Sequence, residues 1–203
     1  HRYGYGNLRD YPLADDKYAI EQLADRYSFI DITKVGIFGH SGGGFMSTAA
    51  LCTYPDFYTA AVSSSGNHDN NIYNNGWVEI HHGVKETKEM VKDSVNGDHE
   101  VSKFSVKVPT NMELAKNLKG HLLLVTGDMD KNVHPAHTLR MVDALIKAGK
   151  NFDMLVLPGK THGYGSADGF FERRLWFHFA KYLLGDTTAD HYGNIEEYKG
   201  IEN

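Results

Sequence analysis

The sequence has little of what marks several large classes of protein. It holds a single cysteine, Cys52, in 203 residues, so no disulfide can form within the chain. None of its apolar runs approaches the ~18 residues that a membrane-spanning helix needs. Its 21 basic residues are outnumbered by 26 acidic ones and form no basic run. These shortages argue against a disulfide scaffold, a membrane span and a nucleic-acid partner.

What is present is the composition of a globular domain, with 41% hydrophobic and 23% charged residues. We expect one domain over residues 1–203, ending in a polar, acidic tail at residues 186–203. Cys52 falls in a helical stretch of small and apolar residues, which indicates a buried packing thiol.

Four short apolar runs predict strands, and helical patterns alternate with them. The strands are expected at residues 35–38, 59–63, 121–126 and 152–157. Helices are expected at residues 10–27, 43–53, 135–147 and 170–183, the first with Leu13, Tyr18, Leu23 and Tyr27 on its inner face. This alternation predicts an α/β fold with a mostly parallel sheet flanked by helices. Ligands of such sheets lie beyond the carboxyl ends of the strands.

Residues 66–118 interrupt this alternation of strands and helices. They are rich in asparagine and in turn-forming residues, with Tyr73 and Trp77 among them. A long irregular stretch inside a compact domain is usually functional, so we expect a lid or a specificity loop here.

The most informative motif runs from Gly39 to Gly43, between a predicted strand and a predicted helix. Its G-x-S-x-G pattern places Ser41 on a sharp turn with an exposed hydroxyl. The flanking glycines are expected to remove Cβ atoms that would collide there. A phosphate-binding loop would need a lysine before its serine or threonine, and a dinucleotide fingerprint would need a different glycine spacing. The pattern predicts the nucleophile elbow of an α/β hydrolase.

A serine nucleophile needs a histidine base and a carboxylate that orients it. In the α/β-hydrolase order the acid follows a later strand than the serine, and the histidine follows a strand later still. Asp128 and Asp130 compete for the acid position after the third strand, and Asp130 is favoured because it stands farther from the strand end. His162 follows the fourth strand and is the best candidate base.

The other histidines offer no site of comparable quality. The pairs His81/His82 and His134/His137 have spacings that could bind a metal, but neither has a clear carboxylate or thiol shell. We therefore predict no metal and no cofactor.

The backbone N–H of Gly42 is expected to donate to the oxyanion. The second donor normally lies upstream of the elbow, where this chain has only about forty residues. We therefore expect an α/β-hydrolase sheet truncated at its N-terminal side, in the C-terminal part of a larger protein. An exposed sheet edge of this kind favours self-association.

Three segments together carry a family resemblance: residues 39–44, 127–134 and 161–163. They resemble the catalytic domain of the prolyl oligopeptidase family, in particular its dipeptidyl peptidase IV-like branch. The resemblance implies a serine peptidase for short peptides, of dipeptidyl-peptidase or acylaminoacyl-peptidase type. It also implies an N-terminal β-propeller in the parent protein. We further expect a homo-oligomer.

Residue by residue, the resemblance implies that Ser41 is the nucleophile, Asp130 the acid and His162 the base. Asn132 and Val133 match positions that contact the substrate. The family's proline pocket is aromatic, whereas the corresponding region here offers the site candidates His68, Tyr73 and Trp77 among asparagines. Proline preference and cellular compartment are left open. An esterase or lipase, and a non-catalytic scaffold, are the alternative functions.

Overall fold

The computed structural model describes residues 4–188. Its centre is a sheet of β1 (Val35–His40), β2 (Tyr58–Ser64), β5 (His121–Gly127) and β6 (Asp153–Leu157). The strands lie in the order β1-β2-β5-β6, and each neighbouring pair is parallel. The α/β class and all four predicted strands are confirmed, with bounds that shift by one or two residues.

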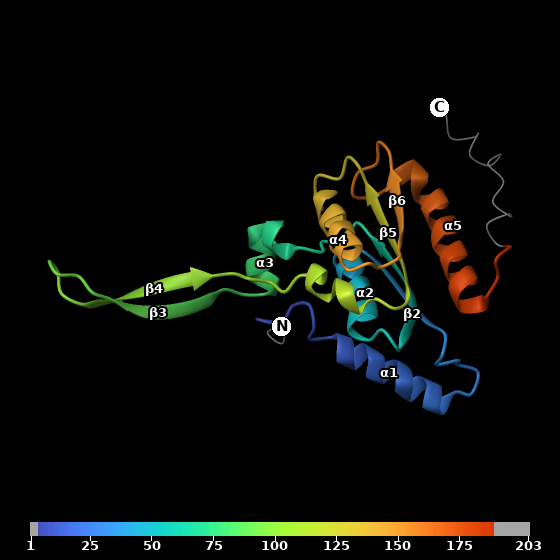
Figure 1. Cartoon of the computed structure of the whole chain (residues 1–203), viewed down its shortest axis with the longest axis horizontal. Helices are drawn as coiled ribbons and strands as arrows, with labels where there is room; N and C mark the ends of the chain where they lie inside the picture. Colours follow the sequence, from blue (N-terminus) through green and yellow to red (C-terminus); the bar gives the residue numbers. More distant parts are fainter. Residues whose placement is uncertain (1–3, 189–203) are drawn as a thin grey trace.

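Helices cover both faces of this sheet (Figure 1). One face carries α2 (Gly42–Thr53) and α4 (Ala136–Lys147), and the other carries α5 (Asp168–Phe179). The chain leaves α5 through a π-helical turn, Ala180–Leu184. Side chains of one strand alternate between the two cores, as the strand period requires: Leu122 and Leu124 pack on the α2/α4 side, Leu123 and Val125 on the α5 side. The sheet is therefore buried on both faces, which explains its continuous apolar strands.

Cys52 lies on α2 in the core, with 0% of its surface exposed. Burial raises the pKa of its thiol to about 12. The prediction of a packing thiol is confirmed.

The inner face predicted for the first helix is largely wrong. Helix α1 (Leu13–Arg26) buries Leu13, and Ile20 is partly buried in the same core, but Tyr18, Leu23 and Tyr27 are all exposed. Residues 13, 17 and 20 share the inner side of the helix at helical spacing. Lys17 lies on this side with its ammonium over the ring of Phe57. Its alkyl stem packs inward on this side of the helix.

Residues 66–118 are more regular than the sequence suggests. They contain α3 (Asn75–His81) and the antiparallel strands β3 (Lys85–Val91) and β4 (His99–Ser105). The 3₁₀ segments Asn70–Ile72 and Asn111–Asn117 stand at the two ends. The hairpin projects from the body as a long arm (Figure 1). It was missed because both of its faces are polar, so the strands show no alternation of apolar and polar residues.

Two further expectations concern the ends of the chain and the membrane. Of the predicted tail, 186–203, residues 189–203 lie outside the described part of the structure. No helix between residues 4 and 188 combines the length and apolar character that crossing a membrane requires.

Candidate active site

Ser41 occupies the turn between β1 and α2 in a strained backbone conformation. Its φ of 59° and ψ of −121° lie outside the regions that a serine ordinarily adopts. The turn is held by hydrogen bonds from the Ser41 N–H to the Ser64 carbonyl (2.8 Å) and from the Phe45 N–H to the Ser41 carbonyl (3.0 Å). This is the geometry that the elbow motif predicts.

The glycines of the motif have different reasons to be glycine. A Cβ at Gly39 would lie 2.4 Å from the carbonyl carbon of Gly43, so the turn requires glycine at position 39. A Cβ at Gly43 would meet nothing within 4 Å, which corrects the expectation that both flanking glycines avoid a collision. The second crowded position is Gly44, where a Cβ would lie 2.7 Å from the Ser64 carbonyl oxygen. Gly44 therefore lets α2 press closely on β2.

Asp130 and His162 meet beyond the carboxyl ends of β5 and β6. The His162 Nδ1 lies 2.8 Å from the Asp130 Oδ2. The Asp130 Oδ1 accepts hydrogen bonds from the N–H groups of Asn132 and Val133, both at 2.9 Å. The carboxylate is 1% exposed, so its hydrogen bonds fix its position. Asp128 points elsewhere and accepts from the Gly159 N–H.

The His162 ring lies beside the elbow, 4.6 Å from the ring of His40, the residue before Ser41. No hydrogen bond joins Ser41 to His162 among the described residues. A loose contact of this kind is common in structures without a substrate.

The loops of Asp130 and His162 are joined closely by their backbones. A Cβ at Gly127 would lie 2.3 Å from the Lys160 carbonyl oxygen and 2.7 Å from that of Thr161. The same Lys160 oxygen accepts from the Met129 N–H at 3.0 Å. Gly127 thus permits the approach on which the contact between Asp130 and His162 depends.

A polar network under the His162 ring escaped the sequence reasoning. The His40 Nδ1 lies 2.6 Å from the Ser64 hydroxyl, which lies 2.9 Å from the Tyr164 hydroxyl. The Tyr164 hydroxyl also lies 3.0 Å from that of Ser65. Burial raises the pKa of Tyr164 and lowers that of His40, and the nearby His162 also lowers the His40 value. The available signals were the serines at the end of β2 and the tyrosine two residues after His162.

Three of the predicted substrate contacts lie at the mouth of this site. The Tyr73 hydroxyl donates to the Asn132 Oδ1 at 2.8 Å, and the Tyr73 ring lies 5.5 Å from that of Trp77. Burial, followed by the charge of Asp130, raises the pKa of Tyr73. Asn132 is exposed and the two rings are half-buried, so a ligand can reach all three.

His68 and Val133 are placed differently from the prediction. His68 is completely buried, with its ring nitrogens near the side chains of Asn111 (3.0 Å) and Ser63 (3.4 Å). Because its ring lies in the core, His68 offers no surface to a substrate. Val133 is also buried, and its contact with the site is the N–H bond to Asp130. Both side chains are inaccessible to a substrate because neighbouring residues cover them.

The histidine pairs with metal-like spacing make other contacts. The His137 Nδ1 accepts from the Asp69 N–H, and the His134 Nδ1 from the Ala136 N–H. Within residues 4–188, no group of three or more His, Cys, Asp or Glu side chains is arranged to hold a metal ion.

Comparison with known proteins identifies the family. The model of the prolyl oligopeptidase family matches residues 1–187. The chain belongs to the prolyl oligopeptidase family. This confirms the resemblance of the elbow, acid and histidine segments, and with it the α/β-hydrolase fold.

The family's dipeptidyl peptidases supply the similar relatives. Dipeptidyl peptidase 8 of Homo sapiens is 30% identical over 179 residues, which are 87% of this chain and 19% of that protein. Dipeptidyl peptidase 4 of Trichophyton rubrum is 30% identical over 156 residues, 76% of this chain and 18% of that protein. The chain therefore spans about a fifth of the length of these relatives.

Solved structures of dipeptidyl peptidases share the fold. The crystal structure of Porphyromonas gingivalis dipeptidyl peptidase 4 matches with a TM-score of 0.68 and 25% identity, covering 86% of this chain and 23% of that one. A putative dipeptidyl aminopeptidase IV from Bacteroides ovatus matches with a TM-score of 0.72 and 21% identity, covering 90% and 24%.

Proposed function

We propose that this chain carries the catalytic residues of a serine peptidase that hydrolyses short peptides, of dipeptidyl-peptidase or acylaminoacyl-peptidase type. The observation that carries the proposal is the 2.8 Å contact between Asp130 and His162 beside a serine in a strained elbow. Membership of the family supports peptidase activity, and the relatives named above are dipeptidyl peptidases.

The proposed mechanism is acyl transfer through Ser41. The Ser41 oxygen attacks the peptide carbonyl carbon while the His162 Nε2 takes the hydroxyl proton. The Gly42 N–H, at the start of α2, donates to the oxyanion that forms. The tetrahedral intermediate then expels the amine, which receives the proton from His162. Water repeats these steps on the acyl-enzyme and releases the acid and Ser41. Asp130 holds the imidazole in the required tautomer throughout.

Variants of the full-length protein test the assignment. Ser41→Ala and His162→Ala are each expected to lower kcat for a dipeptide p-nitroanilide by several orders of magnitude. Asp128→Ala is the matched control for Asp130→Ala, because Asp128 bonds a loop N–H and not the histidine. Wild-type turnover by Ser41→Ala would refute the proposal.

The alternative functions give different results in the same assay. An esterase or lipase would turn over p-nitrophenyl esters and leave the p-nitroanilide intact. A non-catalytic scaffold would fail to react with a fluorophosphonate at Ser41. We expect turnover of the amide and covalent labelling that the Ser41→Ala substitution abolishes.

A further inference from the structure

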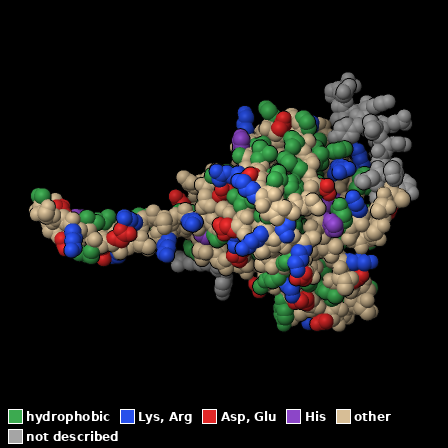
Figure 2. Space-filling view, in the orientation of Figure 1, with side chains coloured by type: hydrophobic (Ala, Val, Ile, Leu, Met, Phe, Trp, Pro, Cys, Tyr) green, Lys and Arg blue, Asp and Glu red, His purple; other side chains and the backbone are tan. Residues whose placement is uncertain are grey.

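The β3–β4 hairpin, here called the arm, pairs with no other strand in the described part of the chain. Every residue of β3 is exposed, and Figure 2 shows acidic, basic and apolar side chains interspersed along the arm. Met90 is 65% exposed and Phe104 69%. A two-stranded sheet without a covered face is marginally stable in water, and its free edges are templates for another strand. The arm therefore has the properties of a contact surface.

The sequence of β3, with the residue before it, is complementary to itself. Residues 84–90 read VKETKEM. If a second copy lies antiparallel with Thr87 facing Thr87, then Lys85 of one copy faces Glu89 of the other. Glu86 likewise faces Lys88, and Val84 faces Met90. Each of these pairs is of a kind that stabilises antiparallel sheets: opposite charges, two threonines, or two apolar side chains.

Other two-fold arrangements lack this match. Moving the centre of the pairing by one residue places Glu86 opposite Glu86, or Lys88 opposite Lys88, and like charges facing each other are destabilising. The other free edge, β4, centred on Ser102, would place Glu100 opposite Phe104 and Val101 opposite Lys103. The charge pattern thus selects the β3 edge and one register.

The ion pairs already present in the arm would continue across the new contact. Lys88 pairs with Glu100 at 2.8 Å, and Glu89 pairs with Lys103. The Ser102 hydroxyl donates to Glu86 at 2.7 Å. Lys85 has no ion-pair partner among the described residues.

In the proposed register, Glu89 would lie between Lys103 of its own arm and Lys85 of the second copy. Charges would then alternate from strand to strand. The register thereby gives Lys85 a partner and places no like charges directly opposite each other.

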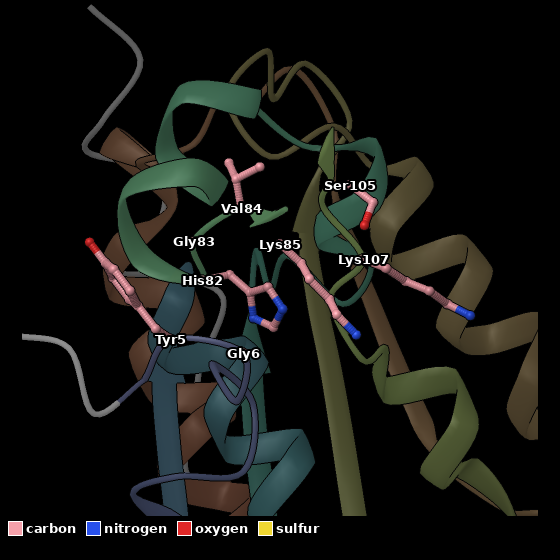
Figure 3. Close-up of a pocket in the computed structure, with 8 residues that line it drawn as sticks. All are labelled: Tyr5, Gly6, His82, Gly83, Val84, Lys85, Ser105 and Lys107. Atoms are coloured by element: carbon pink, nitrogen blue, oxygen red, sulfur yellow. The ribbon is translucent and has the colours of Figure 1, made fainter. Parts of the chain in front are cut away.

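A cavity of about 310 Å³ lies at the root of the arm. Its lining residues are Tyr5, Gly6, His82, Gly83, Val84, Lys85, Ser105 and Lys107 (Figure 3). The same register brings Met90 of the second copy opposite Val84, and Val91 of the second copy opposite Gly83. Met90 and Val91 are exposed apolar side chains in the single chain. The root of each arm thus offers apolar burial to the far end of the other.

We propose that two copies of this chain pair through β3, antiparallel about a two-fold axis at Thr87, to form a four-stranded sheet. The interface is isologous: each residue that one copy contributes meets its counterpart from the other. The proposal concerns assembly and is independent of the proposed peptidase activity.

A cysteine at the axis tests the register directly. Directly opposed residues of antiparallel strands have Cα atoms about 4.5–5.5 Å apart, within the range that a disulfide spans. Thr87→Cys in the full-length protein should therefore form a covalent dimer under mild oxidation, with the linked peptide identified by mass spectrometry. The matched control is Ser102→Cys, at the middle of β4, which should stay uncrosslinked. The chain's own Cys52 is buried and does not compete.

Charge reversal tests the pairing without a cross-link. Lys85→Glu would face Glu89 at two symmetric places, and the dimer dissociation constant should rise about tenfold or more. Lys116→Glu makes the same change at an exposed lysine of the 3₁₀ segment Asn111–Asn117, outside the arm and its root, and should leave the dissociation constant unchanged. Sedimentation velocity measures both.

Four results would overturn the proposal. One is a wild-type protein that stays monomeric throughout the micromolar range. The others are a dimer in which Thr87→Cys does not cross-link, equal cross-linking of Ser102→Cys, and an equal effect of Lys116→Glu. Activity of each variant against the p-nitroanilide reports on its folding separately.

Discussion

Among single residues, Gly127 is decisive for the contact between Asp130 and His162, because it has no side chain. Gly127 ends β5, and backbone atoms of Lys160 and Thr161 occupy the space where a Cβ would stand. Those atoms belong to the loop that carries His162. A change at Gly127 therefore moves His162 relative to Asp130 without removing either group.

We expect Gly127→Ala to lower kcat/KM by about a hundredfold, since a displacement near 1 Å costs on that order. The reason is that the Lys160 carbonyl cannot remain 2.3 Å from a methyl carbon. Gly163→Ala is the matched control: it adjoins His162, but its Cβ would meet nothing within 4 Å. Steady-state kinetics on the p-nitroanilide compares the two. Equal losses would show that Gly127 has no particular role in positioning.

At the scale of elements, the segment after β2 carries Tyr73 to the site and is anchored by one carboxylate. The buried Asp69 accepts from the Asn71 N–H (3.1 Å) and side chain (2.9 Å), and pairs with Arg140 of α4. Asn71 in turn bonds both the carbonyl and the N–H of Val108. These bonds connect the segment to α4 and to the chain that returns from the arm.

Asp69→Ala is expected to destabilise the protein by about 2–4 kcal/mol, because buried polar partners lose their acceptor. It should also raise KM more than it lowers kcat, since Tyr73 loses its support. Asp56→Ala is the control: its pair with Lys119 is exposed, so it should cost well under about 1 kcal/mol. Urea unfolding and steady-state kinetics measure these effects. Similar losses of stability in both variants would contradict the anchoring role.

At the scale of the whole molecule, burial shifts many histidines in one direction. Burial, followed by the charge of His137, lowers the pKa of His68 to about 3. Burial also lowers the pKa of His137, to about 4. The pKa is also lowered, mainly by burial, for His40, His82, His121 and His178. These groups bind protons more readily in the unfolded chain, so acid favours unfolding.

The stability that comes from a neutral His68 is therefore complete above about pH 6.5 and is lost as the pH falls toward 3. The expected loss is roughly 1.4 kcal/mol of unfolding free energy per pH unit for this one group. His68→Gln should reduce the slope of stability against pH by that amount between pH 6 and 4, whatever its effect at pH 7. Urea unfolding across this range gives the slope. Identical slopes for the two proteins would contradict the assignment.

The four strands of the central sheet, the elbow at Ser41 and the two loops that follow later strands could be predicted from the amino-acid sequence. This is possible because buried parallel strands are apolar throughout and because a strained turn requires glycine at a defined spacing. The choice of Asp130 over Asp128 also rested on the sequence, and the structure places Asp130 at His162.

Which residues of each pattern face inward depends on how the elements pack in three dimensions. Tyr18 and Leu23 are apolar but lie on the outer side of α1, His68 is polar but buried, and the arm has no apolar face to reveal it. Gly127 and Tyr164 matter through contacts with residues that are distant in sequence or on another strand. The local sequence pattern indicates which side chains a segment could bury. Which of them are buried depends on the elements that lie next to the segment in space, and the packing of the whole chain sets those neighbours.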